Sequence, residues 1–71
     1  MNTFNFKKYI LKLINENEKG VEINLIINYL DYINKVHYNI NDIEIELNTL
    51  IMEGEIVLKG NFYYSTHAVQ N

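Results

Sequence analysis

Apolar residues recur every three or four positions in the first part of the chain. They are Phe6, Tyr9, Ile10, Leu13 and Ile14. This spacing is the period of a helix that buries one face. Thr3 or Asn5 can cap the start of such a helix, and Gly20 can end it. The pattern therefore predicts a first helix near residues 4–18.

A second amphipathic stretch follows a short alternating segment. The segment Val21-Glu22-Ile23 is read either as a one-sided mini-strand or as an extended link. Asn24 can then cap a helix near residues 25–35. The expected buried stripe of this helix consists of Ile26, Tyr29, Leu30 and Ile33, widened by Leu25, Tyr32 and Val36.

The strongest local signals start a third helix. Asn41 stands three residues before Glu44, as in a capping box, and Ile40 and Ile45 have the spacing of a hydrophobic staple. The expected inward positions are Ile43, Leu47, Leu50 and Ile51. Gly54 is a natural stop, so this helix is expected near residues 42–53.

The end of the chain predicts a β-hairpin. Two segments rich in β-branched and aromatic residues, 56–59 and 62–65, flank the two-residue turn signal Gly60-Asn61. In that register Val57 faces Tyr64, and Leu58 faces Tyr63. Nothing in the sequence holds residues 67–71, so this tail is expected to be frayed.

Length and composition restrict the class of protein. The chain has 71 residues and no cysteine, which fits one small α+β domain over residues 1–71 with its core at about 4–66. No apolar run approaches the roughly 20 residues that span a bilayer. The N-terminal segment lacks the long apolar stretch of a signal peptide. These features lead to the expectation of a cytoplasmic protein that does not contact a membrane.

The order of the predicted elements resembles the winged helix-turn-helix superfamily. The resemblance covers about residues 4–66 and is clearest in the third helix, in Gly54 with Ile56 after it, and in the aromatic return strand 62–65. It implies three helices and a C-terminal hairpin wing. Members of this superfamily usually place the third helix in the DNA major groove and the wing on flanking DNA. Some members bind proteins with the same surfaces, so the fold does not decide the function.

The sequence offers no catalytic or cofactor motif. His37 and His67 have no serine, cysteine or acidic residue at a recognisable catalytic spacing. The sequence has neither a Cys/His cluster for a metal nor a glycine-rich loop for a nucleotide. A non-enzymatic protein without a cofactor is therefore expected.

The charges are distributed unevenly along the chain. Residues 1–20 hold four lysines and two glutamates, a formal net charge of +2. Residues 21–71 hold two lysines and seven acidic residues, a formal net charge of −5. The chain contains no arginine. DNA affinity depends largely on lysine and arginine at phosphates, yet the helix-turn-helix and wing lie in the acidic part. The lysines of the first helix, Lys8, Lys12 and Lys19, are read as a solvated face.

The outward face of the third helix is the expected binding surface. Steps of 100° per residue place apolar side chains among acids on this face. The expected contact residues are Asp42, Ile45, Glu46, Thr49 and Met52. Such a face fits a protein-binding adaptor or a small inhibitor that competes with nucleic acid for a basic site. A phage or mobile-element origin is a further guess from the shortness of the chain.

Two further surfaces remain open from the sequence. In the alternative reading the chain is a dimeric DNA-binding transcriptional regulator, whose contacts would be Asn48, Thr49, Lys59 and Asn61. A domain of this size also carries more apolar surface than one core can use, which predicts a homodimer. The expected dimer residues are Leu25, Tyr32, Val57 and Tyr64.

Overall fold

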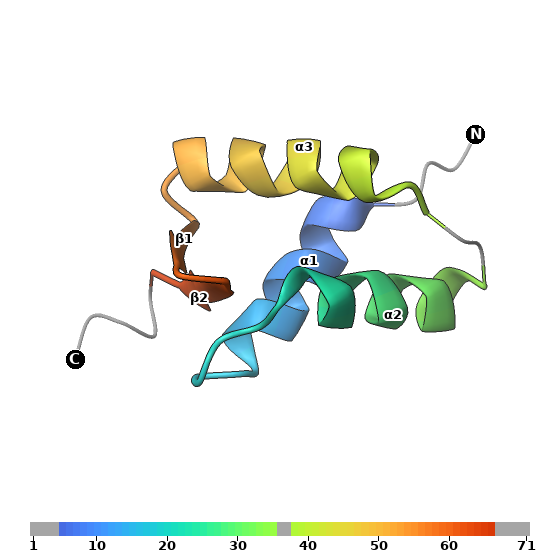
Figure 1. The fold of residues 1–71 in the computed structure, drawn as a ribbon, viewed down its shortest axis with the longest axis horizontal. Coiled ribbons are helices and arrows are strands. Elements are labelled where there is room, and N and C mark those ends of the chain that lie inside the picture. Colours follow the sequence, from blue (N-terminus) through green and yellow to red (C-terminus); the bar gives the residue numbers. More distant parts are fainter. Residues whose placement is uncertain (1–4, 36–37, 67–71) are drawn as a thin grey trace.

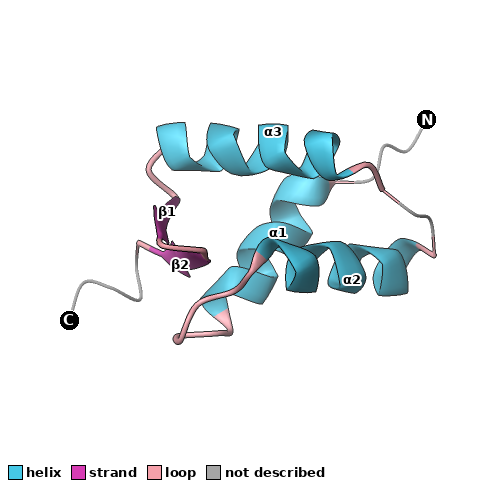
Figure 2. Ribbon diagram, viewed as in Figure 1, coloured by secondary structure: helices cyan, strands magenta, loops and turns pink. Residues whose placement is uncertain are grey.

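Three helices precede a two-stranded antiparallel hairpin in the computed structural model, which describes residues 5–35 and 38–66. The elements are α1 (Phe6–Asn15), α2 (Ile23–Asn34), α3 (Ile40–Met52), β1 (Ile56–Lys59) and β2 (Phe62–Ser65). Figure 1 shows α1 crossing behind α2 and α3, and Figure 2 shows the strands confined to one end of the helical layer. The architecture is small α+β and is compatible with a winged-helix layout. Thr3, Val36, both histidines and the tail 67–71 lie outside the described residues.

The first helix begins as expected and ends early. The Asn5 side chain accepts a hydrogen bond from the Lys8 backbone N–H at 3.1 Å, so Asn5 is the N-cap. The helix ends at Asn15 rather than near residue 18, and Gly20 does not cap it. The reason is local: the Asn17 amide donates to the Leu13 carbonyl at 2.7 Å and satisfies one of the last helical acceptors.

The second helix begins two residues before the expected start. Glu22 is its N-cap residue and makes no side-chain capping bond, while its carbonyl accepts from the N–H groups of Leu25 and Ile26. The prediction that Asn24 caps this helix is therefore wrong, since Asn24 lies in the first turn. The helix ends at Asn34, and Lys35 follows in the left-handed conformation with φ of 57°.

The third helix is capped by a different asparagine from the one predicted. The Asn39 side chain accepts from the Asn41 N–H at 2.8 Å, and the helix starts at Ile40. The expected capping box of Asn41 with Glu44 and the staple of Ile40 with Ile45 are therefore wrong. Two asparagines two residues apart offer the same local signal. Packing of the preceding residue decides between them, because the Tyr38 ring meets Phe6 edge-on at 4.7 Å between centroids.

The end of the third helix was predicted correctly. Gly54 follows the helix with φ of 78°. Its N–H bonds to the Ile51 carbonyl at 3.0 Å, and the Glu55 N–H bonds to the Leu50 carbonyl at 3.0 Å. These two bonds form a Schellman motif, which satisfies the last carbonyls of α3 and turns the chain into β1.

The hairpin has the predicted register, and Val21 extends it. Val57 pairs with Tyr64, and Leu58 pairs with Tyr63. The Val21 N–H donates to the Tyr63 carbonyl at 3.0 Å, and the Tyr63 N–H donates to the Val21 carbonyl at 2.8 Å. The mini-strand reading of Val21-Glu22-Ile23 is thus right for Val21 alone, and the order across the sheet is β1, β2, Val21.

All three helices and the hairpin contribute to one hydrophobic core. Its buried residues are Ile10, Leu13, Ile14, Val21, Ile26, Leu30, Ile43, Leu47, Leu50, Ile56 and Tyr63. Ile51, expected to point inward, is half-buried at the edge of the core. The core faces of α1 and α3 agree with the helical periodicity. The opposite face of α3 is therefore left to solvent.

Gly20 is the most closely packed of the three glycines. Its φ is +97°, and a β-carbon added there would lie 2.8 Å from two ring carbons of Tyr64 and 2.9 Å from the Phe62 β-carbon. Gly20 precedes the Val21 pairing, so its backbone lies directly against the outer face of the hairpin. No other residue type has the backbone freedom and the small size that this position requires.

Gly20→Ala is expected to lower the free energy of unfolding by about 2–5 kcal/mol, since backbone strain and steric overlap add. Gly60→Ala is the matched control: φ is 61°, and no atom lies within 4 Å of an added β-carbon. That substitution should cost only about 1–2 kcal/mol. Urea unfolding followed by circular dichroism measures both. Equal losses would show that the Tyr64 contact does not restrict Gly20.

Candidate functional site

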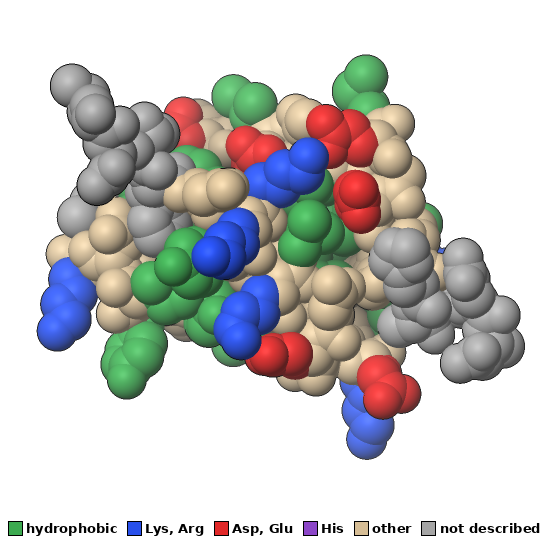
Figure 3. All heavy atoms as spheres, turned by 180° about the vertical axis from the view of Figure 1, so that it is seen from behind, with side chains coloured by type: hydrophobic (Ala, Val, Ile, Leu, Met, Phe, Trp, Pro, Cys, Tyr) green, Lys and Arg blue, Asp and Glu red, His purple; other side chains and the backbone are tan. Residues whose placement is uncertain are grey.

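The outward face of α3 carries two large apolar side chains in solvent. Met52 is 86% exposed and Ile45 is 65% exposed. Asp42 and Thr49 are also exposed, and Glu46 is half-buried at the edge of the same face. The structure thus brings the five predicted contact residues together on one side of α3. Figure 3 shows apolar side chains protruding at the upper rim of the molecule above a row of acids.

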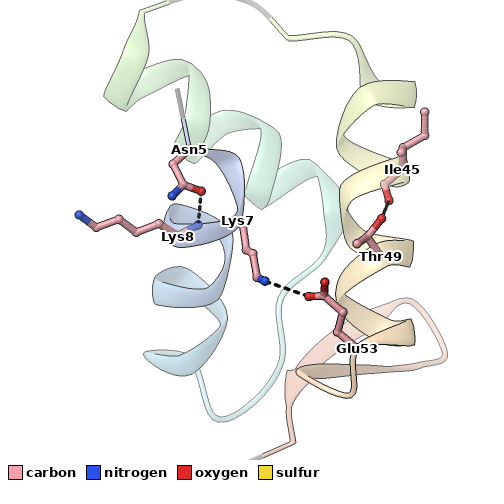
Figure 4. Close-up of polar contacts among 6 residues, drawn as sticks. All are labelled: Asn5, Lys7, Lys8, Ile45, Thr49 and Glu53. Atoms are coloured by element: carbon pink, nitrogen blue, oxygen red, sulfur yellow. Dashed lines mark hydrogen bonds and ion pairs between the residues drawn. The ribbon is translucent and has the colours of Figure 1, made fainter. Parts of the chain in front are cut away.

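Interactions at both ends hold α3 in place. Asn39 caps its start and the Schellman motif closes its end. The Lys7 ammonium of α1 lies 3.0 Å from the Glu53 carboxylate at the end of α3, and Figure 4 shows this link between the two helices. A helix fixed in this way presents its outer side chains at little further cost in backbone entropy.

The acids at the α3 end surround a lysine. The hydrogen bond from Lys7 to Glu53, with the charge of that carboxylate, raises the pKa of the Lys7 ammonium above its ordinary value. Glu55 and Glu46 raise the same pKa further through their charges. Figure 3 shows acidic side chains over α3 and lysines beneath them on this face. Because one lysine meets three carboxylates, the α3 end keeps an acidic character.

The residues proposed to read DNA lie in unfavourable surroundings. Thr49 donates its hydroxyl to the Ile45 carbonyl of its own helix at 3.0 Å (Figure 4), so this donor is already used. Asn48 is exposed on α3, and Lys59 and Asn61 are exposed on the wing. The Lys59 ammonium lies 6.0 Å from the centre of the Tyr64 ring. Asn61 borders a groove that also contains two glutamates.

That groove separates the wing from the first turn of α2 and the side of α3. It has a volume of about 350 Å³ and is open to solvent. Its lining comprises Glu22, Ile23, Asn24, Glu44, Leu58, Gly60, Asn61 and Tyr63. Sequence reasoning missed this site, because its residues come from three segments, the start of α2, α3 and the hairpin, that only the tertiary fold brings together.

Tyr63 has an unusual position at the base of this groove. The residue is 9% exposed, and its backbone pairs with Val21. Burial raises the pKa of the Tyr63 hydroxyl above its ordinary value, and the charge of Glu44 raises it further. A tyrosine hydroxyl is protonated near neutral pH even without this shift, so it can both donate and accept a hydrogen bond here.

The four expected dimer residues come from two elements. Leu25 and Tyr32 project from α2 with exposed fractions of 48% and 81%. Val57 and Tyr64 face each other across the hairpin and are half-buried. Since a β-carbon at Gly20 would collide with the Tyr64 ring, part of the Tyr64 surface is already used within the chain.

Neither a metal-binding cluster nor a membrane-spanning helix occurs among the described residues. In the ranges 5–35 and 38–66, no group of three or more His, Cys, Asp or Glu side chains is placed to hold a metal ion. No helix in the described part of the chain is long and apolar enough to cross a membrane. Comparisons with protein-family models, with curated proteins and with solved structures found no match.

The exposed apolar residues of α2 lead to the expectation of a homodimer. Light scattering at about 10–100 µM, a range suited to a modest interface, should give twice the monomer mass of 8.4 kDa. Tyr32→Ser should return the mass to that of the monomer, because Tyr32 is the most exposed aromatic residue of that face. A monomer at all these concentrations would contradict the expectation and leave the apolar residues to a different partner.

Proposed function

We propose that this chain is a non-enzymatic winged-helix module that binds another protein through the outer face of α3. The observation that carries the proposal is the exposure of Ile45 and Met52 on a helix fixed at both ends and rimmed by acids. Exposed apolar side chains inside a polar rim are typical of protein interfaces. The acids favour a basic surface on the partner and accelerate its approach at low salt.

The layout supports a winged-helix reading without a DNA-binding role. Three helices, a single-residue strand after α1 and a C-terminal hairpin follow the order expected of that superfamily. In DNA-binding members the helix that corresponds to α3 enters the major groove. Here that helix contains three acids and no lysine or arginine. Phosphates would meet like charge along its length.

The charges at the start of α2 also disfavour DNA binding. A helix N-terminus can receive a phosphate on its free N–H groups. In this chain the N-cap residue of α2 is Glu22, and Glu44 borders the same groove from α3. Two carboxylates at this point repel a phosphate. A role as an adaptor, or as an inhibitor that occupies a nucleic-acid-binding surface of its partner, agrees with this charge pattern.

Met52→Ala and Glu46→Lys are each expected to weaken partner binding by about five- to tenfold, since they remove an apolar contact or reverse a rim charge. A pull-down from host lysate supplies the partner, and calorimetry with the purified partner measures the affinity. Met52 is exposed and Glu46 lies half-buried at the edge of the face, outside the core, so the melting temperature should change little.

Glu18→Lys is the matched control for these variants, because it makes the same charge reversal at an exposed position outside α3. It should leave the affinity unchanged. If Met52→Ala and Glu46→Lys both bind with wild-type affinity, the partner site lies elsewhere, with the wing around Val57 and Tyr64 as the next candidate.

The chain is expected to bind generic duplex DNA weakly or not at all at physiological salt, because residues 21–71 have a formal net charge of −5. Fluorescence anisotropy with a labelled duplex, repeated at low salt, measures this. Submicromolar affinity with a steep salt dependence would support the regulator reading instead. In that case Asn48, Thr49, Lys59 and Asn61 become the contacts to substitute.

A further inference from the structure

The groove between the wing and the first turn of α2 combines apolar walls with negative charge. Leu58, which is 47% exposed, and the half-buried Ile23 supply the apolar part of its lining. Glu22 and Glu44 supply two carboxylates, and no lysine lines the groove. Within the described residues the ion pairs of the chain use Glu16 and Glu53 instead. The two carboxylates of the groove therefore face solvent without a protein counter-charge.

The Tyr63 hydroxyl gives the groove an unused hydrogen-bonding group. About nine-tenths of the Tyr63 surface is buried, and the side chain lines the groove. Its hydroxyl has no hydrogen-bond partner within the part of the chain that the structure describes. The hydroxyl is open to solvent in the groove, since no buried side-chain oxygen of the described residues lacks a partner. A ligand in the groove can supply that partner.

The charge of the groove decides which ligand it accepts. The N-terminus of α2 contributes the equivalent of about half a positive charge, which alone would favour an anion. Glu22 and Glu44 together contribute two full negative charges, so the groove favours a positively charged ligand over an anion. A guanidinium group offers five N–H donors in a plane and no acceptor. It can bond to both carboxylates and to the Tyr63 oxygen, while its methylene stem contacts Leu58 and Ile23.

We propose that this groove receives an arginine side chain of the protein partner. The inference rests on the proposed function, because it assigns one anchoring residue to the basic partner of α3. The groove reaches α3 at Glu44, which lies beside the outer face that carries Ile45. One arginine in the groove thus fixes the register of a basic segment that continues over α3.

Titration with capped Gly-Arg-Gly peptide, followed by ¹H–¹⁵N correlation spectra of the full chain, tests the proposal. The backbone amides of Asn24, Glu44, Gly60 and Asn61 should shift with a saturable, low-millimolar dissociation constant, as expected for about one charge-assisted contact group. The peptide with citrulline in place of arginine has the same shape without the charge and should cause no saturable shift. The lysine peptide should bind several-fold more weakly, because it lacks the planar donor set.

Variants locate the contacts. Glu22→Gln and Glu44→Gln should each weaken arginine binding by about three- to tenfold, and Tyr63→Phe by about two- to threefold, while the spectra confirm the fold. Glu46→Gln, outside the groove, is the matched control and should have no effect. The proposal is overturned if the citrulline or lysine peptide binds as well as arginine. It is equally overturned if the shifts map to Asp42 and Glu46, or if the groove variants bind normally.

The outcome is separable from that of the proposed function. Arginine binding in the groove together with unchanged partner affinity in Met52→Ala and Glu46→Lys would retain the groove and reject the α3 site. Loss of partner affinity in those two variants without any arginine binding would retain the α3 site and reject the groove.

Discussion

The backbone pairing of Val21 with Tyr63 connects the helical part of this protein to its hairpin. Two hydrogen bonds join a single residue between α1 and α2 to the middle of β2. The pairing depends on Gly20, whose positive φ brings the backbone against Tyr64. Because the hairpin is held at this point, α1 and α3 can close over one core. The outer side of α3 and the groove beside the wing follow from that arrangement.

The surface carries two acidic regions, one at the end of α3 and one at the groove beside the wing. The acids at the end of α3 gather around Lys7, while Glu22 and Glu44 flank the groove without a lysine. Ile45 and Met52 are exposed on α3, the helix that also carries Glu44. In the winged-helix layout that we propose, the surface that would meet phosphates has the charge that phosphates themselves carry. A basic protein surface meets the same region with favourable electrostatics.

Sequence periodicity predicted the elements that local rules determine. The buried faces of α1 and α3, the stop at Gly54 and the register of Val57 with Tyr64 need only helix period and turn chemistry. The caps of α2 and α3 were misplaced: Asn41 matches the cap preference as well as Asn39 does, and Asn24 matches it better than Glu22, which makes no side-chain capping bond. The groove had no local signal, since Glu22, Glu44 and Tyr63 come from segments that only the tertiary fold brings together. The residue pattern within one segment cannot predict contacts between segments that are far apart in the sequence.

The outer strand of the sheet has a consequence for the state of the protein at high concentration. Among residues 5–35 and 38–66, no strand pairs with the side of β1 away from β2. Unpaired sheet edges recruit strands from other molecules. Here Ile56 at the start of β1 is fully buried, which leaves little accessible backbone there. Lys59 places a charge at the other end, and the strand has only four residues. A short edge strand that is buried at one end and charged at the other disfavours sheet-mediated aggregation.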